Sequence, residues 1–247
     1  MTWITSQSKD IVVLSPHLDD AVWSMGGVLS SLGAMGHRIT VLTLCCSEPH
    51  EETKRLLPEK QHQWRQFGSM FLRKTENQRA LDVLQVEGKH LSFCDSAVDF
   101  DINSGKFSLQ SAEQLFTPPY SYLEQRKKAF ALGLAKQVGE QTILFAPDAC
   151  GGHVDHLACH SAAKSLTVEQ LYFYREFPYA TNPETCSPEE HIQGLTLKAD
   201  WYSWKEAAEK YRSQINCLFS SREEFVSSLA QFAAADSGAE ISFSLSA

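Results

Sequence analysis

Short apolar runs alternate with segments of helical periodicity along most of this chain. Residues 11–16 form a β-branched run, residues 21–36 carry apolar side chains at helical spacing, and residues 38–46 form a second apolar run. The continuous apolar character of both runs is typical of parallel strands that are buried on two faces. A strand, a helix and a strand in this order predict a β-α-β unit with a right-handed crossover.

The same alternation continues through the rest of the chain. We expect helices over 64–84, 121–139 and 201–219, and strands over 90–95, 142–147 and 170–180. Residues 96–120 show no period, and we expect an irregular insertion there. We expect 230–247 to be a partly disordered tail, with 240–245 as a candidate edge strand. The pattern predicts one α/β domain over 1–247, with a Rossmann-like three-layer fold and a mostly parallel central sheet.

Composition excludes some classes of function. Acidic residues number 30 against 22 basic ones, which gives a net charge of −8, and no long Lys/Arg-rich run is present. Binding to a nucleic-acid backbone is therefore disfavoured, because its affinity comes from clustered cations.

Cysteine spacing and the N-terminal segment bear on the compartment. The seven cysteines are odd in number and include no C-x-x-C pair, so we expect no disulfide framework and a reducing compartment. Residues 1–10 carry neither a basic nor an apolar signal region, and no run of eighteen apolar residues occurs. We expect a cytoplasmic protein without a membrane span; the oligomeric state is not predicted.

Two of the predicted strands end in polar clusters that contain histidine. The first cluster follows residue 16 and the second follows residue 147; together they comprise His17, Asp19, Asp20, Asp148, His153, Asp155 and His156. In open parallel sheets, ligands bind where the loops after the carboxyl ends of the strands converge. We therefore expect the two clusters to meet if both strands are central.

The clusters have the composition of a metal site. Three nitrogen or oxygen ligands with one open position are typical of catalytic zinc. The favoured set is His17, Asp20 and His156, which leaves Asp19 and His153 without a metal. For Asp19 and Asp20 alone, capping of a helix would be the better explanation. The presence of histidine with acid at both strand ends favours metal binding.

These residues resemble a known family. The segments "PHLDDAVWSMGG" and "GGHVDHLA" are similar to the P/A-H-x-D-D-x-x-x-x-x-G-G and G-x-H-x-D-H signatures of the PIG-L/LmbE-like metal-dependent N-deacetylases. Two helical segments give further support: "ENQRALDVLQV", in which Gln85 replaces a glycine, and "KEAAEKYRSQ". The resemblance covers roughly residues 10–220. Leu18 replaces the usual proline, and Ala21 replaces a frequent acid.

The resemblance implies the roles of the site residues. The metal, Zn²⁺ with Fe²⁺ or another divalent ion as alternatives, would be held by His17, Asp20 and His156. Asp19 would be the general base, and His153 would stabilise the oxyanion. Asp155 would orient His153 and favour its protonated form. These roles agree with the chemistry of amide hydrolysis, in which a bound metal lowers the pKa of water and a carboxylate takes its proton.

The implied function is removal of an N-acetyl group from a small molecule that contains an amino sugar. Arg73 and Asp95 resemble substrate-contact positions of the family, and Tyr174 and Arg175 are weaker candidates from an aromatic strand. The alternative enzyme is a metal-dependent amidase or deacylase that acts on a larger acyl group or on a non-sugar N-acyl biosynthetic intermediate.

Two other classes of function are disfavoured. A dinucleotide-binding domain would carry G-x-G-x-x-G where this chain has "PHLDDA", and two carboxylates there would repel a pyrophosphate. A binding protein without catalysis would not need both the candidate base and every candidate ligand.

Overall fold

The fold is known from a computed structural model, which describes residues 8–49, 69–181, 195–235 and 240–245. One seven-stranded sheet forms its centre, with the order β3-β2-β1-β6-β7-β9-β8. The strands are β1 (Asp10–Ser15), β2 (Arg38–Cys45), β3 (Glu87–Phe93), β6 (Ile143–Pro147), β7 (Gln170–Tyr174), β8 (Leu195–Lys198) and β9 (Glu240–Leu245). The first five are parallel, and β9 is antiparallel to its neighbours on both sides.

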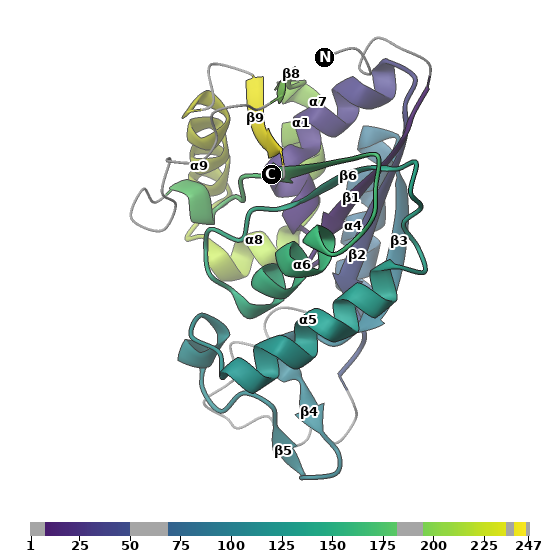
Figure 1. The fold of residues 1–247 in the computed structure, drawn as a ribbon. Helices are drawn as coiled ribbons and strands as arrows, with labels where there is room; N and C mark the ends of the chain where they lie inside the picture. The colour runs from purple at the N-terminus through teal and green to yellow at the C-terminus, as the bar shows by residue number, and fades with distance from the viewer. Residues whose placement is uncertain (1–7, 50–68, 182–194, 236–239, 246–247) are drawn as a thin grey trace.

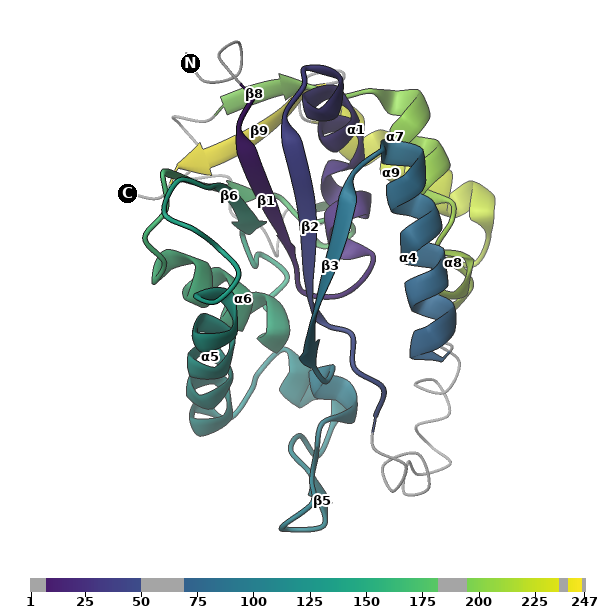
Figure 2. The same cartoon turned by 90° about the vertical axis from the view of Figure 1, so that its right-hand side faces the viewer.

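Helices cover both faces of this sheet, as Figures 1 and 2 show. The α-helices are α1 (Asp20–Ala34), α4 (Met70–Leu84), α5 (Tyr120–Leu134), α6 (Val154–Lys164), α7 (Trp201–Ala208), α8 (Arg212–Leu218) and α9 (Arg222–Ala235). α5 and α6 pack on one face, and α1, α4 and α7 on the other. The predicted three-layer α/β fold with a mostly parallel sheet is confirmed. Division into one domain stays a prediction.

The two largest clusters of buried apolar side chains lie one on each face of the sheet. The larger includes Trp23 from α1, Trp204 from α7 and Phe225 from α9. The smaller includes Phe130 from α5 and Cys159 from α6. Burial of two faces accounts for the continuous apolar runs in the strands.

α1 and α7 approach closely because of a glycine pair. A Cβ atom at Gly26 would lie 2.5 Å from Cδ1 of Trp204, and one at Gly27 would lie 2.8 Å from Cβ of Ala199. The indole nitrogen of Trp204 donates to the carbonyl of Val22 at 2.8 Å. The glycines of the first motif therefore serve helix packing beside the candidate site.

The two supporting helical motifs contact each other. The Glu76 carboxylate accepts from the backbone nitrogen of Ser213 at 2.9 Å and from its hydroxyl at 2.5 Å. The Tyr211 hydroxyl lies 2.8 Å from Oδ1 of Asn77 and 3.0 Å from the carbonyl of Leu18. These contacts tie α4 and α8 to the turn that carries the first polar cluster.

Several boundaries differ from the sequence predictions. The insertion is not wholly irregular, since it contains the hairpin β4 (Phe100–Asp101) and β5 (Lys106–Phe107) between the 3₁₀ turns η2 (Ser96–Val98) and η3 (Ala112–Leu115). The late helix breaks into α7 and α8 around Lys210. α9 extends past residue 230 into the predicted tail, and β9 lies inside the sheet because β8 forms the edge. The start of the helix expected over 64–84 lies outside the described residues.

None of the described helices has the length and apolar character needed to cross a membrane.

Candidate metal centre and active site

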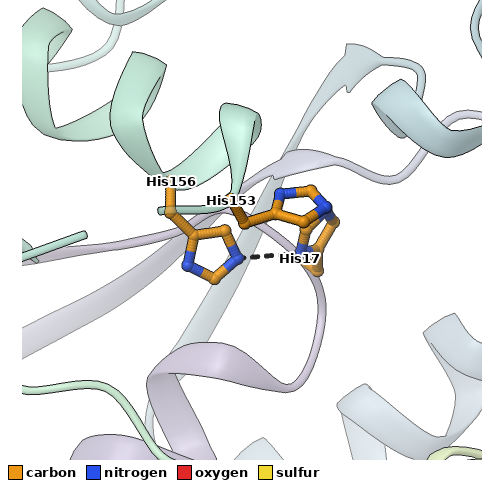
Figure 3. A group of neighbouring side chains, drawn as sticks. All are labelled: His17, His153 and His156. Atoms are coloured by element: carbon orange, nitrogen blue, oxygen red, sulfur yellow. Dashed lines mark hydrogen bonds between the residues drawn. The ribbon is translucent and has the colours of Figure 1, made fainter. Parts of the chain in front are cut away.

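The two polar clusters meet at one edge of the sheet. β1 and β6 are neighbouring parallel strands, so the segments that follow them leave the sheet side by side. His17 lies between β1 and α1, and His153 and His156 lie where α6 begins. Figure 3 shows the three rings close together, and one ring nitrogen of each lies within 4.8 Å of the other two. The strand order therefore produces the convergence that the sequence predicts.

Hydrogen bonds at the outer edge of two rings decide which nitrogen faces the cluster. Nε2 of His17 lies 3.2 Å from Oδ2 of Asp155, and Nδ1 of His156 contacts Oε1 of Glu176. A carboxylate only accepts hydrogen bonds, and with Asp20 acting as a metal ligand the proton of each neutral ring goes to the nitrogen that contacts Asp155 or Glu176. The remaining nitrogens, Nδ1 of His17 and Nε2 of His156, present lone pairs to each other and to the cluster.

These two nitrogens and one carboxylate oxygen form a nearly equilateral triangle of possible metal ligands. Nδ1 of His17 lies 3.2 Å from Oδ2 of Asp20 and 3.2 Å from Nε2 of His156, and the third side measures 3.5 Å. Ligand atoms about 2.0–2.1 Å from a tetrahedral Zn²⁺ would lie about 3.3–3.4 Å apart. Lone pairs at these separations repel one another unless bound protons or a metal ion neutralise them. The donor set therefore fits a divalent metal.

The electrostatic environment of the triangle also favours positive charge. Burial alone lowers the pKa of His17, but the carboxylates of Asp95, Asp155 and Asp20 outweigh this effect and raise the pKa well above its usual value. Burial likewise lowers the pKa of His156, and Asp20 and Glu176 reverse the shift. The same negative charge that favours protons on these ligands would favour a metal ion, which would replace the protons when it binds.

Asp19 does not cap the helix that it precedes. It occupies the N-cap position of α1, yet its side chain makes no capping hydrogen bond. The carboxylate is buried, with one oxygen 3.8 Å from Nη2 of Arg73. Burial raises the pKa of Asp19, and Asp20 adds to the shift while Arg73 opposes it. The capping explanation therefore fails, and a buried carboxylate of raised basicity lies beside the triangle.

His153 differs from the other two histidines in the direction of its pKa shift. Its Nδ1 accepts a hydrogen bond from the backbone nitrogen of Asp155 at 3.3 Å, so a neutral ring carries its proton on Nε2. Burial, with His156 nearby, lowers the pKa of His153 to about 4. This shift favours a neutral ring near pH 7, whereas the resemblance implies a protonated one; the oxyanion role of His153 stays a prediction.

The Asp155 carboxylate makes its hydrogen bonds to residues other than His153. It contacts Nε2 of His17 at 3.2 Å and Nε of Arg126 at 2.5 Å. Burial alone would raise the pKa of Asp155, but Arg126 and His17 hold it well below its usual range. The backbone nitrogen of Asp155 supplies the hydrogen bond to the His153 ring, and the carboxylate, although directed at His17 and Arg126, raises the pKa of His153 through its charge.

The predicted substrate contacts separate into two groups. Arg73 and Asp95 lie at the cluster, the first beside Asp19 and the second with Oδ2 3.5 Å from Nε2 of His17. Tyr174 is fully buried and its hydroxyl donates to the carbonyl of Leu14 at 2.7 Å, so its prediction as a substrate contact is wrong. The aromatic alternation there reflects core packing.

Arg175 stays a prediction as a substrate contact. Its Nη2 donates to the carbonyl of Ala180 at 3.1 Å. This hydrogen bond joins the exit of β7 to η4 (Tyr179–Thr181).

Sequence reasoning missed several residues that support the cluster. Glu176 follows β7, which neighbours β6, so the rule that pointed to the first two strand ends could have indicated it. Tyr179 packs over Gly151, where a Cβ would lie 2.3 Å from its ring, and its ring centroid lies 5.4 Å from that of His156. No sequence feature indicated Arg126 or Ser96, because they reach Asp155 from segments that lie outside the two polar clusters.

One cysteine takes part in a disulfide, which the cysteine spacing did not predict. Cys150, two residues after Asp148, is disulfide-bonded, whereas Cys45, Cys46, Cys94, Cys159 and Cys217 are free. Cys186 lies outside the described residues. The cysteine-based argument for a reducing compartment therefore does not hold, and the cytoplasmic location stays a prediction.

Comparison with known proteins places this geometry in context. The chain is 26% identical over 190 residues to 2'-N-acetylparomamine deacetylase of Streptomyces fradiae, covering 74% of this chain and 62% of that protein. It thus spans less than two thirds of that relative's length. The crystal structure of the zinc-inhibited form of teicoplanin deacetylase is similar, with a TM-score of 0.77 and 21% identity over 96% of this chain and 99% of the other.

The fold also occurs with another activity. The 4-carboxy-2-hydroxymuconate hydratase of Pseudomonas putida matches with a TM-score of 0.52 and 15% identity, over 96% of this chain and 95% of the other. The fold alone therefore does not determine the reaction.

The family assignment rests on a sequence profile. The PIG-L profile, described as GlcNAc-PI de-N-acetylase, matches residues 12–167, which is more than half of the chain and includes both polar clusters. The chain belongs to the PIG-L family.

Proposed function

We propose that this protein is a metal-dependent N-deacetylase that hydrolyses the N-acetyl group of a small molecule containing an amino sugar. The observation that carries the proposal is the triangle of three lone-pair atoms from His17, Asp20 and His156, with the buried Asp19 carboxylate beside it. We propose Zn²⁺ as the metal, with Fe²⁺ or another divalent ion as alternatives. Two nitrogens and one oxygen are a common ligand set of catalytic zinc.

The metal would polarise the acetamide carbonyl and lower the pKa of water. Asp19 takes the proton of the water that adds to the acetamide carbon. The raised pKa of Asp19 suits this role, because a stronger base holds that proton better. The neutral His153 ring donates its Nε2–H to the oxyanion as the carbonyl carbon becomes tetrahedral.

Collapse of this tetrahedral species breaks the C–N bond. The amine nitrogen takes the proton from Asp19, so acetate and a free amine leave. Arg73, 3.8 Å from Asp19, and Asp95, near His17, are proposed to bind polar groups of the substrate. An amino sugar offers hydroxyls for both side chains.

The substrate class is supported by the relatives. The similar Streptomyces protein is named for an N-acetylated paromamine. Because the fold is shared with a hydratase, the assay must detect the hydrolysis products themselves.

The test is release of acetate and free amine by chelated and then metal-reloaded protein. The panel contains N-acetylated amino sugars, their glycosides and matched N-acyl compounds with longer chains. We expect release by reloaded wild type, no release by chelated protein, and a large loss of turnover in Asp19→Asn with one equivalent of metal still bound. Asp10→Asn, on the exposed start of β1, is the matched control and should retain full activity.

Unchanged acetate release by Asp19→Asn would overturn the assignment of the base. Release only from compounds with longer acyl chains would favour the alternative deacylase. Absence of metal binding by wild type would overturn the metal-dependent function.

A further inference from the structure

Four donors surround the carboxylate of Asp155, which is completely buried. Oδ1 accepts from the Ser96 hydroxyl at 2.6 Å and from Nε of Arg126 at 2.5 Å. Oδ2 accepts from the Ser96 backbone nitrogen at 3.0 Å and from Nε2 of His17 at 3.2 Å. A carboxylate has about four lone-pair positions, so each donor fills one. The direction of this carboxylate is therefore set from several sides.

Arg126 supplies the guanidinium of this set, and it is itself held in place. It projects from α5, is 8% exposed, and its Nη2 donates to the carbonyl of Cys94 beyond the end of β3. Its guanidinium carbon lies 5.0 Å from the ring centroid of Phe130 and 5.9 Å from that of Tyr122. A planar guanidinium held by hydrogen bonds and two rings fixes the position of its partner better than a flexible ammonium group would.

The position of Asp155 matters because a second carboxylate competes for the same proton. Oδ2 of Asp95 lies 3.5 Å from Nε2 of His17, against 3.2 Å for Oδ2 of Asp155. Asp95 is anchored through Oδ1 to the backbone nitrogen of Ala97 at 2.9 Å. If Asp155 moved, Asp95 would attract the His17 N–H. Rotation of the ring would then turn Nδ1 away from Asp20 and His156.

We propose that Arg126 is a positioning residue for the candidate metal centre: it holds Asp155 against His17, so that Nδ1 of His17 faces the other two ligands. This inference rests on the proposed metal-dependent function. Ser96 assists from η2. The predicted insertion and α5 thereby contribute to metal affinity, although neither supplies a ligand. Loss of outer-shell partners of metal ligands typically weakens metal affinity about 10–100-fold.

The test measures metal affinity in chelated protein by competition with a coloured chelator, using Zn²⁺ and Co²⁺. We expect Arg126→Lys to weaken affinity about 10-fold and Ser96→Ala to weaken it less. Lys127→Met, the neighbour whose ammonium pairs with Glu124, is the control and should leave affinity unchanged. Far-UV circular dichroism and thermal midpoints verify folding. Ser96→Ala, a smaller change, keeps the proposal testable if Arg126→Lys does not fold.

A double-mutant cycle separates positioning from a general structural effect. In an Asp155→Asn background, Arg126→Lys should cause little further loss of affinity, because its effect passes through that carboxylate. Nitrogen NMR of metal-loaded protein should show the Nε2–H tautomer of His17 in wild type and a mixture in Arg126→Lys.

The outcomes distinguish the two proposals. The positioning role alone would be overturned if Arg126→Lys kept the metal affinity of wild type. It would also be overturned if Arg126→Lys weakened affinity just as much in the Asp155→Asn background. A wild-type protein that binds no divalent metal would overturn this role and the proposed function together. If Arg126→Lys weakens metal affinity only while Asp155 is present, and wild type releases no acetate, the role of Arg126 is supported and the proposed reaction is contradicted.

Discussion

Glu176, beyond the end of β7, accepts a hydrogen bond from Nδ1 of His156, at the start of α6. Both side chains are buried. The contact mirrors that of Asp155 with His17, so each candidate histidine ligand has its own carboxylate partner. Such partners fix the tautomer of a ligand and raise its basicity.

Replacement of Glu176 should therefore weaken metal binding. We expect Glu176→Ala to lower Zn²⁺ affinity about 10–100-fold and Glu176→Gln to lower it less, since the amide oxygen still accepts from Nδ1 of His156. Chelator competition measures both affinities. Glu169→Gln, which removes an ion pair with Lys9, is the control. Equal affinities for wild type and Glu176→Ala would contradict a role for this carboxylate.

Asp148 should make stability depend on pH. Burial, with the Glu176 carboxylate nearby, raises the pKa of Asp148 from an ordinary value of 3.8 to about 8. The folded state therefore binds this proton more tightly than the unfolded state does. Its stabilising contribution is complete below about pH 4 and is lost as the pH rises through about 8. Neutral Asn lacks this dependence but keeps an oxygen for the backbone nitrogen of Cys150.

We expect the free energy of unfolding of Asp148→Asn to rise relative to wild type between pH 4 and pH 8, by an amount on the order of a few kcal/mol. Urea unfolding of chelated protein at several pH values measures this difference. Asp101→Asn, an exposed carboxylate with a lowered pKa, is the control and should follow the wild-type slope above pH 5. If the free energies of unfolding of Asp148→Asn and wild type changed in parallel with pH, Asp148 would be ionised throughout this range.

Gln85 should carry backbone strain at the end of α4. It is the C-cap residue and adopts φ 56°, ψ 40°, a left-handed conformation that favours glycine. Glycine is also what the family pattern has here. We expect Gln85→Gly to raise the free energy of unfolding by about 0.5–1 kcal/mol, because relief of strain exceeds the added entropy of the unfolded chain. Gln85→Ala, which keeps a Cβ, should give no gain, and a destabilised glycine variant would refute the strain argument.

Features that depend on local sequence could be predicted, whereas features that depend on tertiary packing could not. The strand-end rule located His17, Asp20 and His156, because β1 and β6 are adjacent and their motifs are local. Arg126 reaches the cluster only through the packing of α5, so no local spacing indicates it, whereas the strand-end rule applied to β7 could have indicated Glu176. Helix periodicity located α1, whereas the break between α7 and α8 depends on tertiary contacts. Tyr174 was misassigned because alternation alone does not distinguish a packed aromatic residue from an exposed one.

Phe116 offers a last test, of how the substrate is bound. Its side chain is 49% exposed, yet its ring centroid lies 5.5 Å from that of His153 at an interplanar angle of 82°. An aromatic ring that stays half exposed beside a buried polar cluster is suited to stack on the apolar face of a sugar.

We expect Phe116→Ala to raise KM for an N-acetylated amino sugar about 5–10-fold, which corresponds to about 1–1.4 kcal/mol of lost binding, with kcat changed much less. Phe116→Tyr should remain near wild type. Steady-state kinetics of acetate release measures both parameters, and Tyr120→Ala, a 78% exposed aromatic at the start of α5, is the matched control. A loss confined to kcat would mean that Phe116 supports His153 through their edge contact and does not bind the substrate.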